Sequence, residues 1–310
     1  MYSMQIAIID LGTNTFNLMV AETQGTSYSI LLEDKYHAKL GKGGINHGLI
    51  TPEAMERGMD GLRHHINTLT RYKVEKIHCF ATAAIRSAQN GNDFVNRVKN
   101  ELDLDIQVID GQREAELIYD GVKQVFPMSD ENVLILDIGG GSNEFVVANK
   151  EGVKWKHSFN LGVSRLLDKF HPKDPITQAE IAVIESYLNE ELQLLFDSVK
   201  EFNVRRMIGS SGSFDTLAAI IAAKYHPHFD AFKSTSFEIE MMKFKELHNV
   251  LMNSTVAQRS CMEGMDMQRV ELIILGSIFI NFVVDKLKLT HITQVAYALK
   301  EGAIFQLIKN

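Results

Sequence analysis

The sequence contains little cysteine, proline or tryptophan, with two, five and one of these residues among 310. The two cysteines, Cys79 and Cys261, form no CxxC pattern, which argues against a disulfide framework and against a cysteine-based zinc site. Because free cysteine is among the most often buried residue types, both are predicted to be small buried side chains. No stretch rich in proline, glycine or serine looks like a linker, so two domains would meet tightly, near residues 121–132.

Long apolar runs are also missing, since none reaches the roughly 18 residues that a membrane helix needs. No basic segment followed by a cleavable apolar stretch precedes the strand-like residues that begin at Gln5. With 45% apolar and 23% charged residues, the composition is that of a globular protein, and a cytoplasmic location is expected. The formal net charge of −7 argues against a general nucleic-acid binder. It does not exclude an anionic ligand, because backbone amides, arginines and a metal ion can bind phosphate inside an acidic protein.

Strand-like and helix-like segments alternate along the chain, which is typical of an α/β fold. Thr51 is a candidate N-cap with Pro52 at the first helical position, and Thr177 with Glu180 forms a capping box. The predicted strands cover 4–10, 16–22, 76–84, 106–110, 132–141, 143–150, 152–159, 204–213 and 292–298. The predicted helices cover 51–70, 92–102, 114–126, 177–202, 214–225, 241–253, 267–286 and 300–309.

Residues 133–147 repeat a pattern found near the N-terminus, in which a strand ends in Asp-x-Gly, turns, and continues as a second strand. Asp10 and Gly12 of the first copy match Asp137 and Gly139 of the second, in both cases 127 residues apart. Two copies predict two similar α/β domains that face one another. The alternative is a chance similarity between two apolar hairpins.

Three glycine turns follow strand-like segments, with the sequences DLGTNT, DIGGGSNE and IGSSGS. Such a turn exposes consecutive N–H groups and lets the backbone approach a phosphate, although each one alone could be an ordinary tight hairpin. Asp10 and Asp137 end the strands before two of these turns, where a hard cation such as Mg²⁺ could be held beside phosphate. Together the turns predict a site for a phosphate-containing ligand.

Further motifs accompany the turns, among them FATAAIRSAQNGNDFVNRV, VIDGQREAELIYDGV, SFNLGVSRLLDKF, MQRVELIILG and YALKEGAI. In their order, over nearly the whole chain, they resemble the exopolyphosphatase and guanosine pentaphosphate phosphohydrolase (Ppx/GppA) family. The resemblance implies a duplicated α/β, actin-like (ribonuclease H-like) fold, shared with sugar kinases and heat-shock chaperones. It implies one domain at 1–123 plus about 298–310 and a second at 124–297, around a central cleft.

The resemblance assigns the activation of an attacking water to Glu114, which matches the glutamate before the alanine of the third family motif. It associates Asp137 and Glu144 with a divalent metal ion, Mg²⁺ or Mn²⁺, and Asp10 is the matching metal candidate of the first copy. A carboxylate that activates water beside a metal-bound phosphate is chemically sensible. Without the resemblance, Glu114 could equally be a solvated charge in the first turn of a helix, where acids are favoured.

The resemblance also implies a set of phosphate-binding residues. Arg86 would clamp phosphate with two hydrogen bonds, and Arg269 would point toward the cleft, although each could instead form a surface ion pair. Amides and hydroxyls of the turns complete the set. The expected phosphate-binding residues are Thr13, Asn14, Arg86, Gly139, Gly140, Gly141, Ser142, Ser211, Gly212 and Arg269.

Four positions depart from the family pattern. Arg113 stands where the third motif usually has a second acid, and Asn17 stands where a basic residue is common. Lys42 replaces a usual glutamate, and Lys300 replaces the arginine before the last Glu-Gly pair. These changes leave the expected catalytic set whole, so they bear on substrate preference and affinity.

The eleven histidines include the adjacent pair His64 and His65 on a predicted helix. No HxH or HExxH pattern accompanies them, so both are interpreted as surface or packing residues. Trp155 is likewise predicted to pack rather than to stack on a base.

The sequence therefore predicts a hydrolase that releases terminal orthophosphate from inorganic polyphosphate or guanosine pentaphosphate. Two alternatives remain open: an ATP-dependent kinase of the same superfamily, and a regulatory protein that binds guanosine tetra- or pentaphosphate with weak turnover. The resemblance allows a homodimer, whereas nucleic-acid and membrane partners are not expected. The chain ends at Asn310 without the C-terminal helical domain of longer members, so limited processivity on long polymers is expected.

Overall fold

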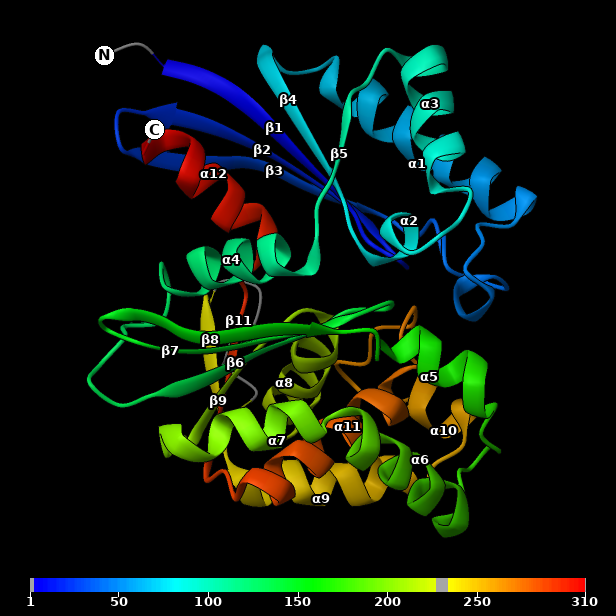
Figure 1. Cartoon of the computed structure of the whole chain (residues 1–310), viewed down its shortest axis with the longest axis vertical. Helices are drawn as coiled ribbons and strands as arrows, with labels where there is room; N and C mark the ends of the chain where they lie inside the picture. The colour runs from blue at the N-terminus through cyan, green and yellow to red at the C-terminus, as the bar shows by residue number, and fades with distance from the viewer. Residues whose placement is uncertain (1–2, 227–233, 310) are drawn as a thin grey trace.

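The computed structural model describes residues 3–226 and 234–309, which form two β-sheets with helices around and between them (Figure 1). The first sheet contains β1 (Ser3–Leu11), β2 (Phe16–Gln24), β3 (Ser27–Tyr36), β4 (Val74–Ala81) and β5 (Ile106–Val108). The second contains β6 (Val133–Ile138), β7 (Asn143–Asn149), β8 (Gly152–Phe159), β9 (Arg206–Ser210), β10 (Ser236–Ile239) and β11 (His291–Val295).

The helices differ in length, and two of them are short 3₁₀ segments, η1 (Ile45–His47) and η2 (Lys200–Phe202). Among the described residues, none is both long and apolar enough to cross a membrane. The first six are α1 (Pro52–Leu69), α2 (Ala83–Arg86), α3 (Gly91–Leu102), α4 (Gly111–Val122), α5 (Val163–Phe170) and α6 (Gln178–Glu191). The others are α7 (Gln193–Val199), α8 (Gly212–Tyr225), α9 (Met241–Met252), α10 (Val256–Ser260), α11 (Ile273–Leu287) and α12 (Leu299–Lys309).

The two sheets repeat one topology. In the first, β3, β2 and β1 form an antiparallel meander, and β4 and β5 continue parallel to β1. In the second, β8, β7 and β6 form the same meander, and β9 and β11 continue parallel to β6. Strand β10 is an addition that pairs antiparallel with β11. This repeat confirms the duplicated α/β, actin-like fold class.

The repeat extends to the register of the two hairpins that carry the predicted turns. Asp10 is paired with Asn17 across β1 and β2, and Asp137 is paired with Glu144 across β6 and β7. Directly opposite residues of an antiparallel pair project from the same face of the sheet. The hairpins therefore present matched polar pairs at the ends of their strands, at the places where the sequence repeat locates them.

The predicted helix starts are confirmed by their caps. The Thr51 hydroxyl accepts a hydrogen bond from the Ala54 N–H at 3.2 Å, and Pro52 begins α1. At α6 the capping box is complete, because Thr177 accepts from the Glu180 N–H and Glu180 accepts from the Thr177 N–H. Such caps satisfy backbone N–H groups that have no partner inside the helix.

Helices α4 and α12 lie side by side between the two sheets (Figure 1). Their buried side chains share one apolar cluster with residues of both sheets, so the pair is packed from both directions. From the first sheet the cluster takes Ile6, Ile8, Met19, Ala21 and Phe80, and from the second Val133, Ile135, Val146, Ala148, Ile208 and Val295. The pair therefore fixes the first turn of each helix relative to both sheets.

Several predicted boundaries were wrong. The helix predicted over 177–202 is interrupted at Leu192, whose ψ of 12° departs from helical geometry, while its apolar stripe stays buried on both sides. The helix predicted from residue 267 begins at Ile273, because the preceding residues form turns. Strand β3 was not predicted, although Tyr28, Ile30 and Leu32 alternate with more exposed residues as an edge strand requires.

The cysteines behave differently from one another. Cys79 is buried on β4, as predicted, but Cys261 is exposed, which corrects the prediction that both are buried. Cys261 follows the short helix α10, where the apolar pattern is too brief to indicate which side chains face the core. Trp155 packs against the core of the second sheet and stacks on His157, which confirms its packing role. The division of the chain at residues 123 and 298 stays a prediction.

The contact between α4 and α12 leads to the first testable prediction. A Cβ atom at Gly302 would overlap the carbonyl oxygen of Leu117, so the two backbones meet where only glycine fits. We expect Gly302→Ala to lower the free energy of unfolding by about 2 kcal/mol. The steric overlap should destabilise the protein by up to about 3 kcal/mol, whereas replacing glycine by alanine inside a helix stabilises it by roughly 1 kcal/mol. Urea unfolding measures this change.

The control for this prediction is Gln112→Ala, at an exposed position of α4. Surface substitutions away from special contacts usually change stability by less than about 0.5 kcal/mol. Equal unfolding curves for Gly302→Ala and wild type would contradict a tight backbone contact between the two helices.

Candidate active site

A cleft of about 180 Å³ lies where the two sheets, α4 and α12 meet, and its lining comes from both copies of the repeated motif. Most of the predicted site residues contribute to this lining. They are Asp10, Thr13, Asn14, Glu114, Asp137, Gly139, Gly140, Gly141, Ser142, Ser211, Gly212 and Arg269. The other two do not line it but are bonded to or paired with residues that do, Arg86 with Glu114 and Glu144 with Asp137.

The two glycine turns have the same internal geometry. The Gly12 N–H donates to the Thr15 carbonyl at 3.1 Å, and the Gly139 N–H donates to the Ser142 carbonyl at 3.0 Å. The turns also touch one another, because a Cβ atom at Gly140 would lie 2.7 Å from the side-chain nitrogen of Asn14. The two repeated turns therefore meet at the cleft, through the side chains of Thr13 and Asn14 on one turn and the backbone of Gly140 and Gly141 on the other.

Arg165 at the start of α5 adds a second connection across the cleft. Its guanidinium donates to the carbonyls of Gly141 and Ile45 and to the hydroxyl of Ser87, at 2.7–2.8 Å. Beside it, Ser164 donates to the side-chain oxygen of Asn14 at 2.9 Å. These contacts join the second copy to segments that follow the first, on the side of the cleft away from α4 and α12.

Asp137 stands at the end of β6 and is held by two hydroxyl groups. Ser210 and Ser211 both donate to its Oδ2 atom, each at 2.7 Å. Burial raises the pKa of Asp137, and the two hydroxyls and the charge of Arg269 offset part of this effect. The carboxylate is therefore oriented by fixed donors beside the turn that begins at Gly139.

Glu114 lies in the first turn of α4 and is only 8% exposed. Arg86 donates to its Oε2 atom at 2.8 Å and to the carbonyl of Ile109 at 3.0 Å. Burial, followed by the negative charge of Glu144, raises the pKa of Glu114 well above its usual value, and Arg86 opposes the shift. The N-cap of α4 is Asp110, which accepts from the Arg113 N–H at 2.7 Å, so the Glu114 carboxylate is not used as a cap.

Glu144, which is buried, and Asp10, which is half-buried, complete the group of acids. Glu144 is 1% exposed and accepts from the Ser158 hydroxyl at 2.7 Å. Burial and the charge of Asp137 raise its pKa to about 7. Asp10 accepts from the Asn17 amide at 3.0 Å, and burial raises its pKa to about 6. So many carboxylates in one buried place need a positive charge nearby to remain ionised.

Residues 19–310 match the family model described as the Ppx/GppA phosphatase family. The chain belongs to this family. An exopolyphosphatase from Cytophaga hutchinsonii of known structure is 36% identical, with a TM-score of 0.95 over 98% of each chain. A putative exopolyphosphatase of Haemophilus influenzae is 27% identical over 99% of this chain and 92% of its own.

A third relative is larger. The bifunctional 3-dehydroquinate synthase/phosphatase of Fusobacterium nucleatum is 28% identical over 90% of this chain. The chain spans 43% of the length of that protein. The chain is thus a member of a phosphatase family, and proteins named exopolyphosphatases are among its relatives.

Two departures of this Ppx/GppA phosphatase lie inside the cleft. Lys300 extends from α12 and its Nζ atom is 2.7 Å from Glu33. Its charge also acts to lower the pKa of Asp10, against the larger effect of burial. The side-chain amide of Asn17 donates a hydrogen bond to Asp10, so it is not available to bind an anion.

The other two departures lie outside the cleft. Arg113 points along α4 to Glu116 and to Gln306 of α12, so it joins the two helices. Lys42 is exposed and lines a neighbouring cavity of about 350 Å³.

Two further acids of this phosphatase line the cleft without having been predicted. Asp215, in the first turn of α8, accepts from Gln294 at 2.9 Å, and burial raises its pKa. Glu301, in the first turn of α12, accepts from the Ala298 N–H at 2.8 Å. Because α12 follows β11 as α4 follows β5, Glu301 is the counterpart of Glu114 in the second copy. The signal in the sequence was a basic residue followed by glutamate near each helix start, Arg113–Glu114 in α4 and Lys300–Glu301 in α12.

The donor set of the cleft suits a hard cation. Carboxylates and hydroxyls are oxygen ligands of the kind that Mg²⁺ and Mn²⁺ prefer. Asp10, Asp137 and Glu144 do not bring their oxygens within 4.8 Å of one another, since within the described ranges only one other trio does so. An ion held by one or two of these carboxylates, with water and substrate oxygens, fits this spacing.

The buried acids lead to a prediction about pH. Glu144 ionises near pH 4.5 in an unfolded chain and near 7 in the folded protein. Between these values the folded protein binds a proton that the unfolded chain has lost, so the contribution of Glu144 to stability is present below pH 4.5 and disappears as the pH rises through 7. In EDTA, we expect Glu144→Gln to have a smaller loss of unfolding free energy than wild type between pH 5 and pH 8.

The control is Glu190→Gln, at an exposed position of α6, which should keep the wild-type dependence. Urea unfolding at several pH values supplies the measurement. A Glu144→Gln protein whose stability falls with pH as steeply as wild type would refute the raised pKa.

Proposed function

We propose that this Ppx/GppA phosphatase releases terminal orthophosphate from a linear phosphoanhydride, with inorganic polyphosphate preferred over guanosine pentaphosphate. The observation that carries the proposal is Glu114, a buried carboxylate with a raised pKa at the edge of a wall of phosphate-type turns. The names of the relatives from Cytophaga hutchinsonii and Haemophilus influenzae, both called exopolyphosphatases, also favour polyphosphate.

In the proposed mechanism Glu114 accepts a proton from, or orients, the water that attacks the terminal phosphorus in line. A general base works best when its pKa lies near the working pH, and burial moves Glu114 in that direction. Arg86 donates to the Oε2 atom at 2.8 Å and opposes the upward shift of the pKa, so it favours the ionised form of the base and fixes its orientation. We therefore assign Arg86 a positioning role in addition to the phosphate contact expected from the family.

The transferred phosphoryl group is stabilised by groups on opposite sides of the cleft. The turns at Thr13–Asn14 and Gly139–Ser142 offer N–H groups, and Ser211 and Gly212 open α8, whose N-terminus carries partial positive charge. Arg269 lies against Gly212 and supplies a full positive charge. A divalent cation held by Asp137, Glu144 or Asp10 would neutralise charge on the phosphate oxygens.

The adjoining cavity offers room for the rest of a phosphate chain. It shares Asn14, Thr15, His37 and Arg269 with the cleft. Its other charged or titratable lining residues are Lys39, Lys42 and His171, together with the acids Asp168 and Glu271. Basic side chains along a path away from the reaction centre suit a repeating anion. The lysine at position 42, where relatives usually have glutamate, adds to this basic lining.

The decisive experiment compares phosphate release from polyphosphate and guanosine pentaphosphate for wild type and Glu114→Gln. Because a positioned general base contributes about 10²–10⁴-fold, kcat should fall by about that factor while substrate binding is kept. Glu116→Gln is the matched control, since Glu116 lies on the same helix with a 44% exposed side chain. It should retain wild-type activity.

The same assay separates the alternatives. Oxygen-18 from labelled water should appear in the released orthophosphate, whereas transfer of phosphate to a sugar or an acid would identify a kinase. Tight binding of guanosine nucleotides without phosphate release would identify a regulatory protein. Unchanged activity in Glu114→Gln would overturn the assignment of the base.

A further inference from the structure

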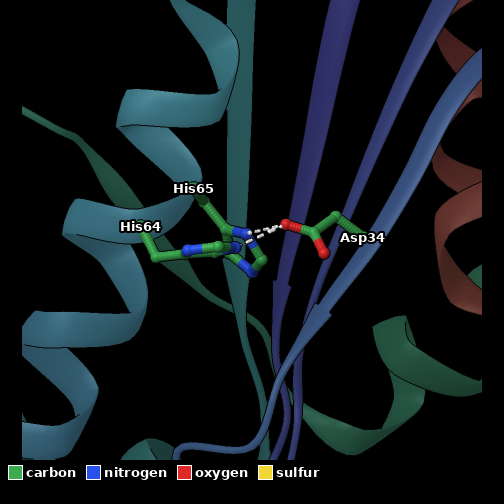
Figure 2. Close-up of side chains that lie close together, drawn as sticks. All are labelled: Asp34, His64 and His65. Atoms are coloured by element: carbon green, nitrogen blue, oxygen red, sulfur yellow. Dashed lines mark hydrogen bonds and ion pairs between the residues drawn. The ribbon is translucent and has the colours of Figure 1, made fainter.

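Three side chains that do not line the cleft lie together where α1 packs against β3 of the first sheet. His64 and His65 project from α1 toward Asp34 on β3 (Figure 2). One ligand atom from each residue lies within 4.8 Å of the others. The Nε2 atom of His64 is 2.8 Å from Asp34 Oδ2, and the Nδ1 atom of His65 is 3.5 Å from the same oxygen.

The hydrogen bonding of His65 determines which of its nitrogens is free. Its Nε2 atom is 3.1 Å from the carbonyl oxygen of Phe16, which can only accept, so Nε2 carries the hydrogen. In the neutral ring, Nδ1 then carries a lone pair. The side chain is 0% exposed, and Nδ1 has no hydrogen-bond partner. This buried lone pair is directed at the Asp34 carboxylate.

A lone pair and a carboxylate oxygen that face each other at 3.5 Å repel unless a positive charge lies between them. Partial burial would raise the pKa of Asp34, but hydrogen bonds from His64 and from the Lys35 N–H outweigh it and leave the pKa below its usual value. Burial lowers the pKa of His65 despite the Phe16 contact and the charge of Asp34. The hydrogen-bond geometry leaves the Nδ1 atom of His65 without a partner beside the Asp34 carboxylate.

His64 completes the group from the solvent side. Adjacent residues of a helix point about 100° apart, so two neighbouring histidines do not normally share a ligand. Here His64 reaches Asp34 through its distal Nε2 atom and His65 through its proximal Nδ1 atom, so both rings converge on one oxygen. The His64 side chain is 47% exposed, which leaves a path for an ion.

We propose that Asp34, His64 and His65 bind one divalent transition-metal ion, with Zn²⁺ the best fit. Two imidazole nitrogens and a carboxylate oxygen are borderline ligands that suit Zn²⁺ and are poor for Mg²⁺. Ligands about 2.1 Å from one tetrahedral ion are about 3.4 Å apart, close to the 3.5 Å between His65 and Asp34. The His64–Asp34 contact would open from 2.8 Å by about 0.6 Å to reach this spacing, and the fourth position faces solvent.

The surroundings suit such a site. A ligating histidine usually donates its other N–H to a carbonyl or carboxylate, which orients the ring, and the Phe16 carbonyl does this for His65. The ion would tie α1 to β3. Phe16 begins β2 directly after the turn that carries Thr13 and Asn14, and Lys35 next to Asp34 lines the cleft. The site therefore supports the wall of the first turn and takes no part in the chemistry.

The proposal is tested on the full-length protein by equilibrium dialysis with Zn²⁺ in the presence of millimolar Mg²⁺, which competes for the oxygen ligands of the cleft. We expect one tightly bound Zn²⁺ per chain, and at least a tenfold weaker affinity in His64→Gln and in Asp34→Asn. His291→Gln, at an exposed histidine on β11, is the matched control and should bind as wild type does. With Co²⁺, visible absorption of a four-coordinate ion should appear in wild type and vanish in His64→Gln.

His64→Gln is the decisive variant, because the half-exposed position tolerates the change, whereas His65→Gln alters a buried side chain. The thermal midpoint should rise with Zn²⁺ in wild type and in Asp137→Asn, and should not rise in His64→Gln. No binding by wild type at micromolar Zn²⁺ would overturn the proposal, as would equal binding by His64→Gln. Loss of the ion in Asp137→Asn would place it in the cleft and would also overturn the proposal.

Discussion

Helices α4 and α12 meet backbone to backbone between the two sheets, and the geometry of the cleft depends on this contact. Each helix begins at the cleft and brings a buried glutamate in its first turn, Glu114 or Glu301. Because the pair is packed by apolar residues of both sheets, neither helix can shift without disturbing both. The spacing between Glu114 and the turn at Gly139 is therefore fixed by a core that lies behind the site.

The second constraint is electrostatic. Asp10, Glu114, Asp137 and Glu144 lie close together, Asp10 half-buried and the other three buried, and desolvation raises the pKa of each. Such a group is unfavourable in a protein at rest, and proteins retain perturbed carboxylates where they serve a ligand or a reaction. Serine hydroxyls, Asn17 and Arg86 hold the carboxylates in fixed orientations without neutralising them all. The carboxylates are thus held in place before any ligand binds, as the proposed cation and general base require.

Much of this arrangement could be predicted from the sequence, because the repeated Asp-x-Gly turns determine both the hairpins and their register. The interrupted helix at Leu192 could not, since its apolar stripe continues unchanged through the break. The grouping of Asp34, His64 and His65 could not be predicted from the sequence either. Adjacent histidines seldom share a partner, and only the packing of α1 on β3 brings Asp34 to them. Local patterns predict elements, whereas contacts between distant segments need the fold.

The caps of α4 and α12 show how the two copies have diverged. In α12 the Glu301 carboxylate closes the start of its own helix by accepting from the Ala298 N–H. In α4 the cap is Asp110, one turn before Glu114, and Asp110 accepts from the Arg113 N–H. The Glu114 carboxylate is therefore not used to cap its own helix. A single capping residue therefore accounts for the different hydrogen bonding of two glutamates that both line the cleft. The duplicated fold places an equivalent acid at the start of each helix. Which neighbouring residue caps the helix determines whether that acid is used as a cap.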